Sequence, residues 1–580
     1  MFIFANVQKT HNFMQFRYSI LSKHLYTIFI LLILLASIGI CWHQEFECQQ
    51  GKCYAISITF ICYLLHSLTT NKNKWGKPLL LFTPILAWCQ FVNIYRNCWN
   101  NRLLLWSISL LLFLRICCNI TKKQWHLVVI FYTTCIILTY IFSHINIFMP
   151  FSLQIFDNPA GLAASLVLGW VCFIPYLHTY FLKALHNNQK RSLGCIILLE
   201  VSTFLLLICI LYFQSRTGCM ALILSTTFYF IYHYRRNLSS KNIIFLIVVA
   251  FILFVCLTLV LYWHNPESIK GRFLIWYTII NMCIQHPFCG WGTNAIEAHY
   301  MAAQAQILST LNDTNHYRWL AGDVVRPFNE FLNWILRYGI IGLLLLILPL
   351  PSLLRKSSHK DRMLTTIIAW SSMGLTSYPS YYPYACLLFM GNIGVETLLP
   401  VHMILPRIFR IAFYLICLLG FITSLFPIYK EAIKEQWIIQ STRYDSAQHI
   451  PQLLSNDIDV AYTYAVNINL LGDAHKSQSS LQTLHGRLQN YDTEILTADN
   501  ALTLHNYSSA LKHFNIAHNM VPTRFMPLYG LMLTHLQQGD TLAARNIATI
   551  ILKKKVKVNS NDVLYIQNEA NKLKLCNTHL

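Results

Sequence analysis

Charged residues are scarce in this chain. Asp, Glu, Lys and Arg make up 12% of its 580 residues, while 55% are apolar. An ordinary soluble domain carries about 25% charged residues, so the composition excludes that class. Acidic residues are rarer than basic ones. The chain has 23 Asp and Glu against 44 Lys and Arg, which gives a formal net charge of +21. Such basicity can indicate a nucleic-acid partner, but its distribution along the chain indicates a membrane instead.

We also expect that the chain has no cleavable signal peptide. Residues 1–24 are mixed polar and aromatic, and no small-residue cleavage site follows the apolar run after them. Between residues 25 and 429 about thirteen apolar stretches alternate with short loops, and a stretch of about 20 apolar residues crosses a bilayer as a helix. We therefore expect an all-α, polytopic helical membrane protein with about twelve or thirteen transmembrane helices.

Basic residues lie in every second loop, which is the positive-inside signature of a multi-pass membrane protein. They place residues 1–24 in the cytoplasm and both the long loop 264–331 and the polar segment 430–580 on the outer side of the membrane. Arg96 and Arg102 are exceptions, in a short loop on the outer side. The regular basic positions are Lys9, Arg17, Lys23, Lys72, Lys74, Lys77, Lys122, Lys123, Lys190, Arg191, Arg235, Arg236, Lys241, Arg355, Lys356, Lys360, Arg362, Arg407 and Arg410.

Residues 430–580 lack any long apolar run and read as amphipathic helices. Ala510, Phe514, Ala517 and Pro522 have the small–aromatic–small–proline spacing of a second tetratricopeptide (TPR) helix, and Ala544 lies one 34-residue period after Ala510. We expect a TPR-like helical domain on the outer side that binds a protein partner or braces the membrane domain. A plain helical hairpin with chance spacing is the alternative.

The long loop is poor in carboxylates that could share a metal ion, since Asp313 and Asp323 are ten residues apart. We therefore expect neither a metal nor another cofactor. Four short motifs stand in order around this loop: Phe156–Gly161, Ser215–Gly218, Arg272 with Trp276 and the following Pro287–Gly292, and Pro327–Leu332 with Gly339 and Gly342.

Together these motifs resemble the O-antigen ligase and polymerase superfamily over about Ile155 to Gly342. The resemblance implies a membrane glycosyltransferase that takes glycan from undecaprenyl pyrophosphate, with inversion at the anomeric carbon. It also implies a bacterial inner membrane, with the long loop 264–331 and residues 430–580 in the periplasm. Transfer to an acceptor hydroxyl of lipid A core or of a protein is the ligase-type reaction that we expect. Polymerisation of glycan repeat units is an alternative, and a non-catalytic lipid-glycan flippase or transporter is a further one.

Negative charge develops on the diphosphate as it departs. The guanidinium group of an arginine can bind this charge through two parallel hydrogen bonds. In the matched motifs we assign this catalytic role to Arg216 and Arg272, with Arg326 as a substrate-binding residue beside them. Trp276 and Asn329 are further candidates for substrate binding. Asn158 either contacts substrate or caps the helix that Pro159 opens.

The chain departs from the family at one position. The family usually carries a histidine directly before the Asn of the last motif, where it is thought to activate the acceptor hydroxyl, but here Phe328 precedes Asn329. Arginine cannot serve as the base because it stays protonated in proteins. Glu330 is our first candidate for a catalytic base. The loop also offers Asp323, His316 and His299. Alternatively, the reaction needs no strong base, or the chain is catalytically altered.

Overall fold

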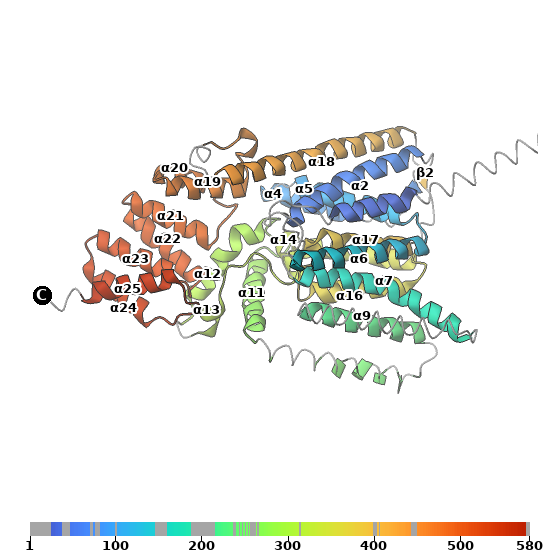
Figure 1. Ribbon diagram of the computed structural model, residues 1–580, viewed down its shortest axis with the longest axis horizontal. Coiled ribbons are helices and arrows are strands. Elements are labelled where there is room, and N and C mark those ends of the chain that lie inside the picture. The colour runs from blue at the N-terminus through green and yellow to red at the C-terminus, as the bar shows by residue number, and fades with distance from the viewer. Residues whose placement is uncertain are drawn as a thin grey trace, which may run out of the picture.

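The computed structural model is helical apart from one antiparallel pair of two-residue strands, β1 (Lys74–Trp75) and β2 (Met403–Ile404) (Figure 1). The expectation of an all-α chain is therefore confirmed for the part of the chain that the structure describes. That part comprises residues 25–37, 47–69, 74–75, 82–98, 101–145, 159–186, 215–235, 266–312, 315–397, 403–404, 407–441 and 449–575, with scattered positions between 239 and 263.

A helical bundle forms one half of the molecule and the C-terminal helices form the other (Figure 1). The elements up to the end of the bundle are α2 (Glu47–Thr69), α4 (Thr83–Tyr95), α5 (Asn101–Cys117), α6 (Lys122–Ile145), α7 (Pro159–His186), α9 (Arg216–Tyr234), α11 (Pro266–Gln285), η2 (Ile296–Tyr300), α12 (Met301–Ser309), α13 (His316–Leu320), α14 (Glu330–Ile347), α15 (Pro349–Arg355), α16 (Lys360–Gly374), η3 (Pro379–Tyr381), α17 (Pro383–Glu396) and α18 (Arg407–Ser441). The C-terminal elements are η4 (Gln452–Leu454), α19 (Ile458–Leu470), α20 (Ala474–Thr483), α21 (Tyr491–Thr503), α22 (Tyr507–Met520), α23 (Met526–Gln537), α24 (Thr541–Lys553) and α25 (Asn561–Leu575).

Helices α9 and α16 pack side by side in opposite directions. His233 near the end of α9 lies 3.6 Å from Asp361 near the start of α16. Because a helix advances about 1.5 Å per residue, Arg216 begins α9 at the level near Thr376, where α16 has just ended. We call this level the junction end of the bundle, since the long loop and the C-terminal helices meet the bundle there (Figure 1), and the opposite level the far end.

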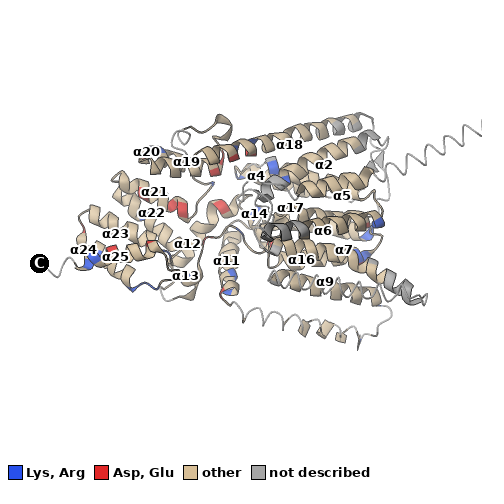
Figure 2. Ribbon diagram, in the orientation of Figure 1, with Lys and Arg blue, Asp and Glu red and all other residues tan. Residues whose placement is uncertain are grey.

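Two described helical stretches, Gly161–Thr179 and Glu330–Arg355, are long and apolar enough to cross a membrane. The stretches Leu25–Ser37 and Lys52–Leu65 are apolar but shorter. Charge is sparse along the middles of the bundle helices and gathers at their ends, as Figure 2 shows. Twelve or thirteen crossings remain a prediction, and the apolar run Leu193–Phe213 lies outside the described residues.

Helix α14 is broken at Gly339, whose φ of 69° and ψ of −177° are not helical. The loop segment Pro287–Gly292 fills the break with main-chain hydrogen bonds. Trp291 and Gly292 donate to the oxygens of Leu336 and Arg337 at 2.8 and 2.9 Å, and Ile340 donates to the Pro287 oxygen at 2.8 Å. Backbone groups freed by a break need such partners when they are buried in protein.

Close approach of the two backbones requires glycine on both sides of the break. A Cβ on Gly339 would lie 1.9 Å from the Phe288 oxygen, and a Cβ on Gly290 would lie 2.6 Å from the Leu336 oxygen. Both residues also have positive φ, which side chains disfavour. The Pro287–Gly292 motif is thus a plug for a broken helix.

Arg96 and Arg102, the exceptions to the charge pattern, both make structural contacts at the junction end. Arg96 Nε donates to the Gly290 oxygen at 3.0 Å, and Arg102 pairs with Glu431 of α18. Helix α18 continues without interruption to Ser441, so the predicted boundary at residue 430 falls inside a helix. The change to polar composition marks where α18 leaves the apolar bundle and not where it ends.

The C-terminal helices form successive hairpins. Gly472, His505 and Gly539 each have positive φ, and each precedes the N-cap residue of the second helix of its hairpin. The small and aromatic positions singled out in the sequence, including Ala510, Phe514 and Ala544, are fully buried. These three turns are 33 and 34 positions apart along the chain.

The C-terminal domain packs directly on the long loop. Gln304 of α12 donates to the main-chain oxygens of Met520 (2.8 Å) and Gly322 (3.0 Å), and Gln489 N donates to the Glu297 oxygen at 2.9 Å. Ala517 and Met520 share one apolar cluster with the η2–α12 segment. The domain therefore holds the loop against the bundle.

Candidate functional site

A tyrosine-rich turn, Tyr378–Tyr384, forms the centre of the junction end. Two prolines fix its backbone, with Pro379 opening η3 and Pro383 opening α17. The rings of Tyr378 and Tyr382 stack with centroids 5.9 Å apart, and those of Tyr382 and Tyr384 stack at 5.5 Å. The turn is therefore a rigid aromatic wall.

Arg272 reaches this turn from α11. Its Nη1 donates to the Thr376 oxygen at 2.9 Å, and its guanidinium carbon lies 5.1 Å from the centre of the Phe328 ring. The Phe328 ring in turn meets Tyr378 edge-on, with centroids 5.3 Å apart. Arg272 of the first loop motif thus contacts Phe328 of the last loop motif, and Phe328 contacts the aromatic wall.

Arg326 lies on the same wall. Its guanidinium carbon is 3.7 Å from the centre of the Tyr381 ring and 4.7 Å from that of Tyr378. Lys52 of α2 also approaches Tyr381, with Nζ 5.0 Å from the ring centre. Cations from three separate parts of the chain therefore gather around neighbouring aromatic rings.

Trp276 and Asn329 were expected to bind substrate, but their side-chain N–H groups bind main-chain oxygens in the structure. Trp276 Nε1 donates to the Pro327 oxygen at 3.1 Å, and Asn329 Nδ2 donates to the Leu375 oxygen at 3.1 Å. Asn329 also caps α14, because its Oδ1 accepts from Leu332 N at 3.0 Å. Trp276 and Asn329 therefore hold in place the turn that carries Arg326 and Phe328. In this way they determine the shape of the site.

Glu330, the first residue of α14, is 4% exposed. Its Oε1 accepts hydrogen bonds from the backbone N, at 3.0 Å, and from the hydroxyl of Ser380. Its Oε2 is buried and makes no hydrogen bond within the described residues. The carboxylate thus binds η3 from behind the aromatic wall, one residue away from Tyr381.

Arg216 is described through its backbone, as the first residue of α9. Ser215 caps this helix, with its hydroxyl accepting from Gly218 N at 3.3 Å. The helix start supplies a positive dipole end at the junction level, where negative charge is favoured. The Ser215–Gly218 motif therefore directs a helix N-terminus to the same level as Arg272.

Asn158 lies outside the described residues, but the glycine of its motif does not. A Cβ on Gly161 would lie 2.5 Å from the Tyr384 hydroxyl and 2.6 Å from the Tyr382 ring. The start of α7 therefore packs directly on the aromatic wall. Gly161, Arg272 and Phe328, which come from three of the four motifs, therefore lie at or beside this wall, and the fourth motif begins α9 at the same level.

The other loop candidates for a base are His316, Asp323 and His299. His316 and Asp323 are exposed. The His299 ring lies 4.7 Å from Trp291, which bonds to the Met282 oxygen and so sits about 15 Å along α11 from Arg272. Burial, helped by the charge of Arg96, lowers the pKa of His299.

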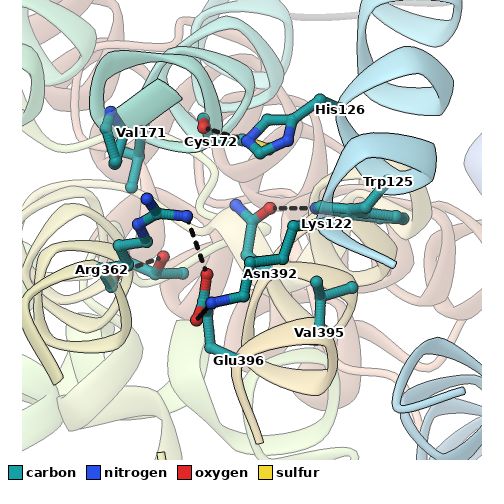
Figure 3. A pocket seen from close by; sticks show the side chains of 11 residues that line it. Lys122, Trp125, His126, Val171, Cys172, Arg362, Asn392, Val395 and Glu396 are labelled. Atoms are coloured by element: carbon teal, nitrogen blue, oxygen red, sulfur yellow. Dashed lines mark hydrogen bonds and ion pairs between the residues drawn. The ribbon is translucent and has the colours of Figure 1, made fainter. Parts of the chain in front are cut away.

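The far end carries a separate polar cluster, shown in Figure 3. Lys122 and Arg362 both pair with Glu396, at 2.9 and 3.5 Å, and Trp125 donates to Asn392 at 2.8 Å. These residues line a small pocket and tie α6, α16 and α17 together. No group of three or more His, Cys, Asp or Glu suited to a metal ion occurs within the described residues.

Lys52 and the Tyr378–Tyr384 turn are the parts of this site that sequence reasoning missed. Tyrosines near a helix end are common at a membrane interface, so this segment is unremarkable in a sequence, although two prolines among four tyrosines signal a fixed backbone. Lys52 stands near the start of a long apolar run, where a single cation at a helix end is unremarkable. Its position beside Tyr381 follows from packing between distant helices.

Comparison with known protein families gives a match over residues 201–347 to the family described as O-Antigen ligase. Neither curated proteins nor solved structures give a match to the chain. The matched region contains Arg216, Arg272, Arg326 and Glu330, whereas Lys52, Gly161 and the Tyr378–Tyr384 turn lie outside it. Residues 201–347 are therefore similar to the O-antigen ligase family, whose members are membrane-embedded, glycosyltransferase-like enzymes.

Proposed function

We propose that the chain is a ligase-type glycosyltransferase of the bacterial inner membrane. Its donor is a glycan on undecaprenyl pyrophosphate, and its acceptor is a hydroxyl group of lipid A core or of a protein. The reaction takes place at the junction end, which faces the periplasm together with the long loop and the C-terminal domain.

The observation that carries the proposal is the convergence of cations at the junction end. Arg272 and Arg326 come from the two ends of the long loop and meet at Phe328 and Tyr378, while α9 begins at the same level with Arg216. Guanidinium groups fixed beside one another suit a diphosphate, whose charge grows as it departs.

In the proposed reaction the acceptor oxygen attacks the anomeric carbon of the glycan from the side opposite the diphosphate. The new carbon–oxygen bond forms as the bond from that carbon to the phosphate oxygen breaks, so the configuration inverts. Undecaprenyl diphosphate leaves with the bonding electron pair, and Arg216, Arg272 and Arg326 stabilise it. The acceptor proton passes to a base, which we assign to Glu330.

Glu330 is compatible with this role in two respects. Ser380 fixes one carboxylate oxygen, and the other makes no hydrogen bond within the described residues. The carboxylate also lies next to the wall that carries Arg326. Exposure of 4% requires that the acceptor enter between the wall and α14 to reach it.

The C-terminal hairpins complete the proposal as a TPR-like periplasmic domain. The turns at Gly472, His505 and Gly539 and the buried Ala510 and Phe514 support this assignment. We propose that the domain braces the long loop and offers its remaining surface to a protein partner.

The direct test is transfer by the purified full-length protein. Polyprenyl-diphosphate glycan and a defined acceptor are mixed with it, and the product is identified by mass. A single glycan attached to the acceptor supports the ligase. Lengthened glycan that stays on the lipid carrier identifies a polymerase, and absence of any transfer with an intact donor contradicts both.

A deletion strain separates the enzyme from a flippase, because the two leave the lipid-linked precursor on different faces of the membrane. The proposed ligase predicts precursor that accumulates on the outer face and surface glycan that is lost. Precursor retained on the inner face would contradict the proposal and identify a transporter.

A further inference from the structure

Lys52 belongs to none of the motifs that support the proposed function, yet its side chain reaches the same wall. Its Nζ lies 5.0 Å from the centre of the Tyr381 ring, the ring that also carries Arg326 at 3.7 Å. Lys52 and Arg326 are separated by more than 270 positions in the sequence. Two cations from distant segments therefore border one aromatic ring.

Arg326 lies over the Tyr381 ring, with its guanidinium carbon 3.7 Å from the ring centre. A guanidinium carries five N–H donors in one plane and binds phosphate oxygens through pairs of them. The ammonium group of Lys52 adds a compact charge with three rotatable donors beside the same ring.

The backbone that carries Lys52 is rigid. Lys52 stands in the second turn of α2, a helix that packs along α18 and α5. Ser57 and Ser424 share a 2.8 Å hydrogen bond between α2 and α18, and Gly420 allows close approach to Phe60. A charged group placed on such a framework is oriented more precisely than one on a loop.

The support behind Tyr381 is equally firm. Ser380 binds Glu330 through its backbone N and its hydroxyl, and the Ser380 oxygen accepts from Cys386 Sγ at 3.3 Å. The ring of Tyr381 also meets Tyr382 edge-on with centroids 5.3 Å apart. Tyr381 therefore fixes the separation between the two cations.

We propose that Lys52 is a substrate-binding residue that, with Arg326 on the Tyr381 ring, holds the diphosphate of the lipid-linked donor. The inference rests on the proposed function and extends it with a cation from the N-terminal part of the bundle. A phosphate group on the acceptor has the same chemistry, and the experiment distinguishes the two sources.

The test uses the full-length protein in nanodiscs and polyprenyl diphosphate as the probe. Lys52→Met keeps the apolar stem and removes the charge, while Lys52→Arg keeps a cation. Loss of one charge-assisted contact corresponds to about a tenfold rise in Kd, so we expect that rise for Lys52→Met and recovery to within about threefold for Lys52→Arg. Lys270→Met is the matched control, because Lys270 is an exposed cation on α11 near Arg272.

In the transfer assay Lys52→Met should raise the KM of the donor about tenfold and leave kcat within about twofold. An unchanged Kd for polyprenyl diphosphate overturns the inference, as does a rise in the acceptor KM without a rise in the donor KM. Should Lys52→Met fail to fold, an unchanged Kd for a folded Lys52→Gln variant overturns it equally. Wild-type protein that binds the diphosphate through Lys52 but transfers no glycan contradicts the proposed function and leaves the binding inference standing.

Discussion

The guanidinium group of Arg272 donates a 2.9 Å hydrogen bond to the main-chain oxygen of Thr376, a residue 104 positions later in the chain. This bond joins the start of the long loop to the turn that follows α16. It orients Arg272 toward Phe328 and the tyrosine wall, where Arg326 also lies. The predictions below test the parts of this arrangement separately.

Glu330→Gln tests the proposed base. Glutamine keeps an oxygen for Ser380 but cannot take up the acceptor proton, so turnover should fall about 100-fold while thermal unfolding changes little. Ser380→Ala is the control, because it removes a hydrogen bond and leaves the carboxylate, at a cost of about 1 kcal/mol in stability. Wild-type turnover by Glu330→Gln would show that Glu330 braces η3 and that the proton goes elsewhere.

Gly339→Ala tests the plug of the broken helix. A Cβ at this position would lie 1.9 Å from the Phe288 oxygen, and the backbone has φ of +69°. We expect a loss of about 1–3 kcal/mol in the free energy of unfolding, measured by thermal unfolding in detergent.

Gly271→Ala serves as its control. A Cβ on Gly271 meets nothing within 4 Å, and the residue lies inside α11. Alanine there should leave stability unchanged or raise it by about 0.5–1 kcal/mol. Equal effects of the two substitutions would contradict the proposed tightness of the plug.

Gln304→Ala tests the docking of the C-terminal domain on the loop. The substitution leaves the Met520 and Gly322 oxygens without this donor, which costs about 1–3 kcal/mol. Hydrogen exchange in residues 296–309 and 517–521 should rise together. Gln306→Ala, at an exposed position two residues later, should leave both segments as in wild type. Faster exchange confined to one of the two segments would contradict direct docking.

His518 gives the C-terminal domain a pH-dependent stability. Burial, with smaller effects of Lys554 and Arg318, lowers the pKa of His518 to about 3, against about 6.5 in an unfolded chain. Below pH of about 6.5 the unfolded state binds a proton that the folded state excludes, so stability falls as pH drops.

We therefore expect His518→Gln to gain thermal stability relative to wild type as pH falls from about 7 to about 5. The measurement is the melting temperature of both proteins across that range. His475→Gln, at an exposed histidine, should show no such trend. A difference between His518→Gln and wild type that stays constant with pH would contradict the prediction.

Much of the candidate site could be predicted from the sequence, because its residues belong to short motifs that can be recognised in the sequence. Arg272, Arg326 and Asn329 were assigned to one site from four short motifs, and the structure brings them together at the junction end. The helical nature of the chain followed from apolar run lengths alone. The family match over residues 201–347 covers three of these four motifs.

Other parts depend on contacts that a single sequence does not contain. The plug at Gly339 consists of main-chain hydrogen bonds, and such bonds cannot be predicted from the identities of the side chains. Trp276 was expected to bind substrate because of its motif, but its indole N–H binds the Pro327 oxygen. Lys52 reaches Tyr381 through packing of α2 against the rest of the bundle, which no spacing within either segment predicts.

Turnover of the purified Arg272→Ala variant on polyprenyl-diphosphate glycan tests the central claim most directly. Removal of one oriented donor from a developing anion should lower turnover about 100-fold or more, while Lys270→Ala, which removes an exposed cation from the same helix, should stay within about twofold of wild type. Full turnover by a folded Arg272→Ala variant would contradict the claim that this arginine grips the departing diphosphate.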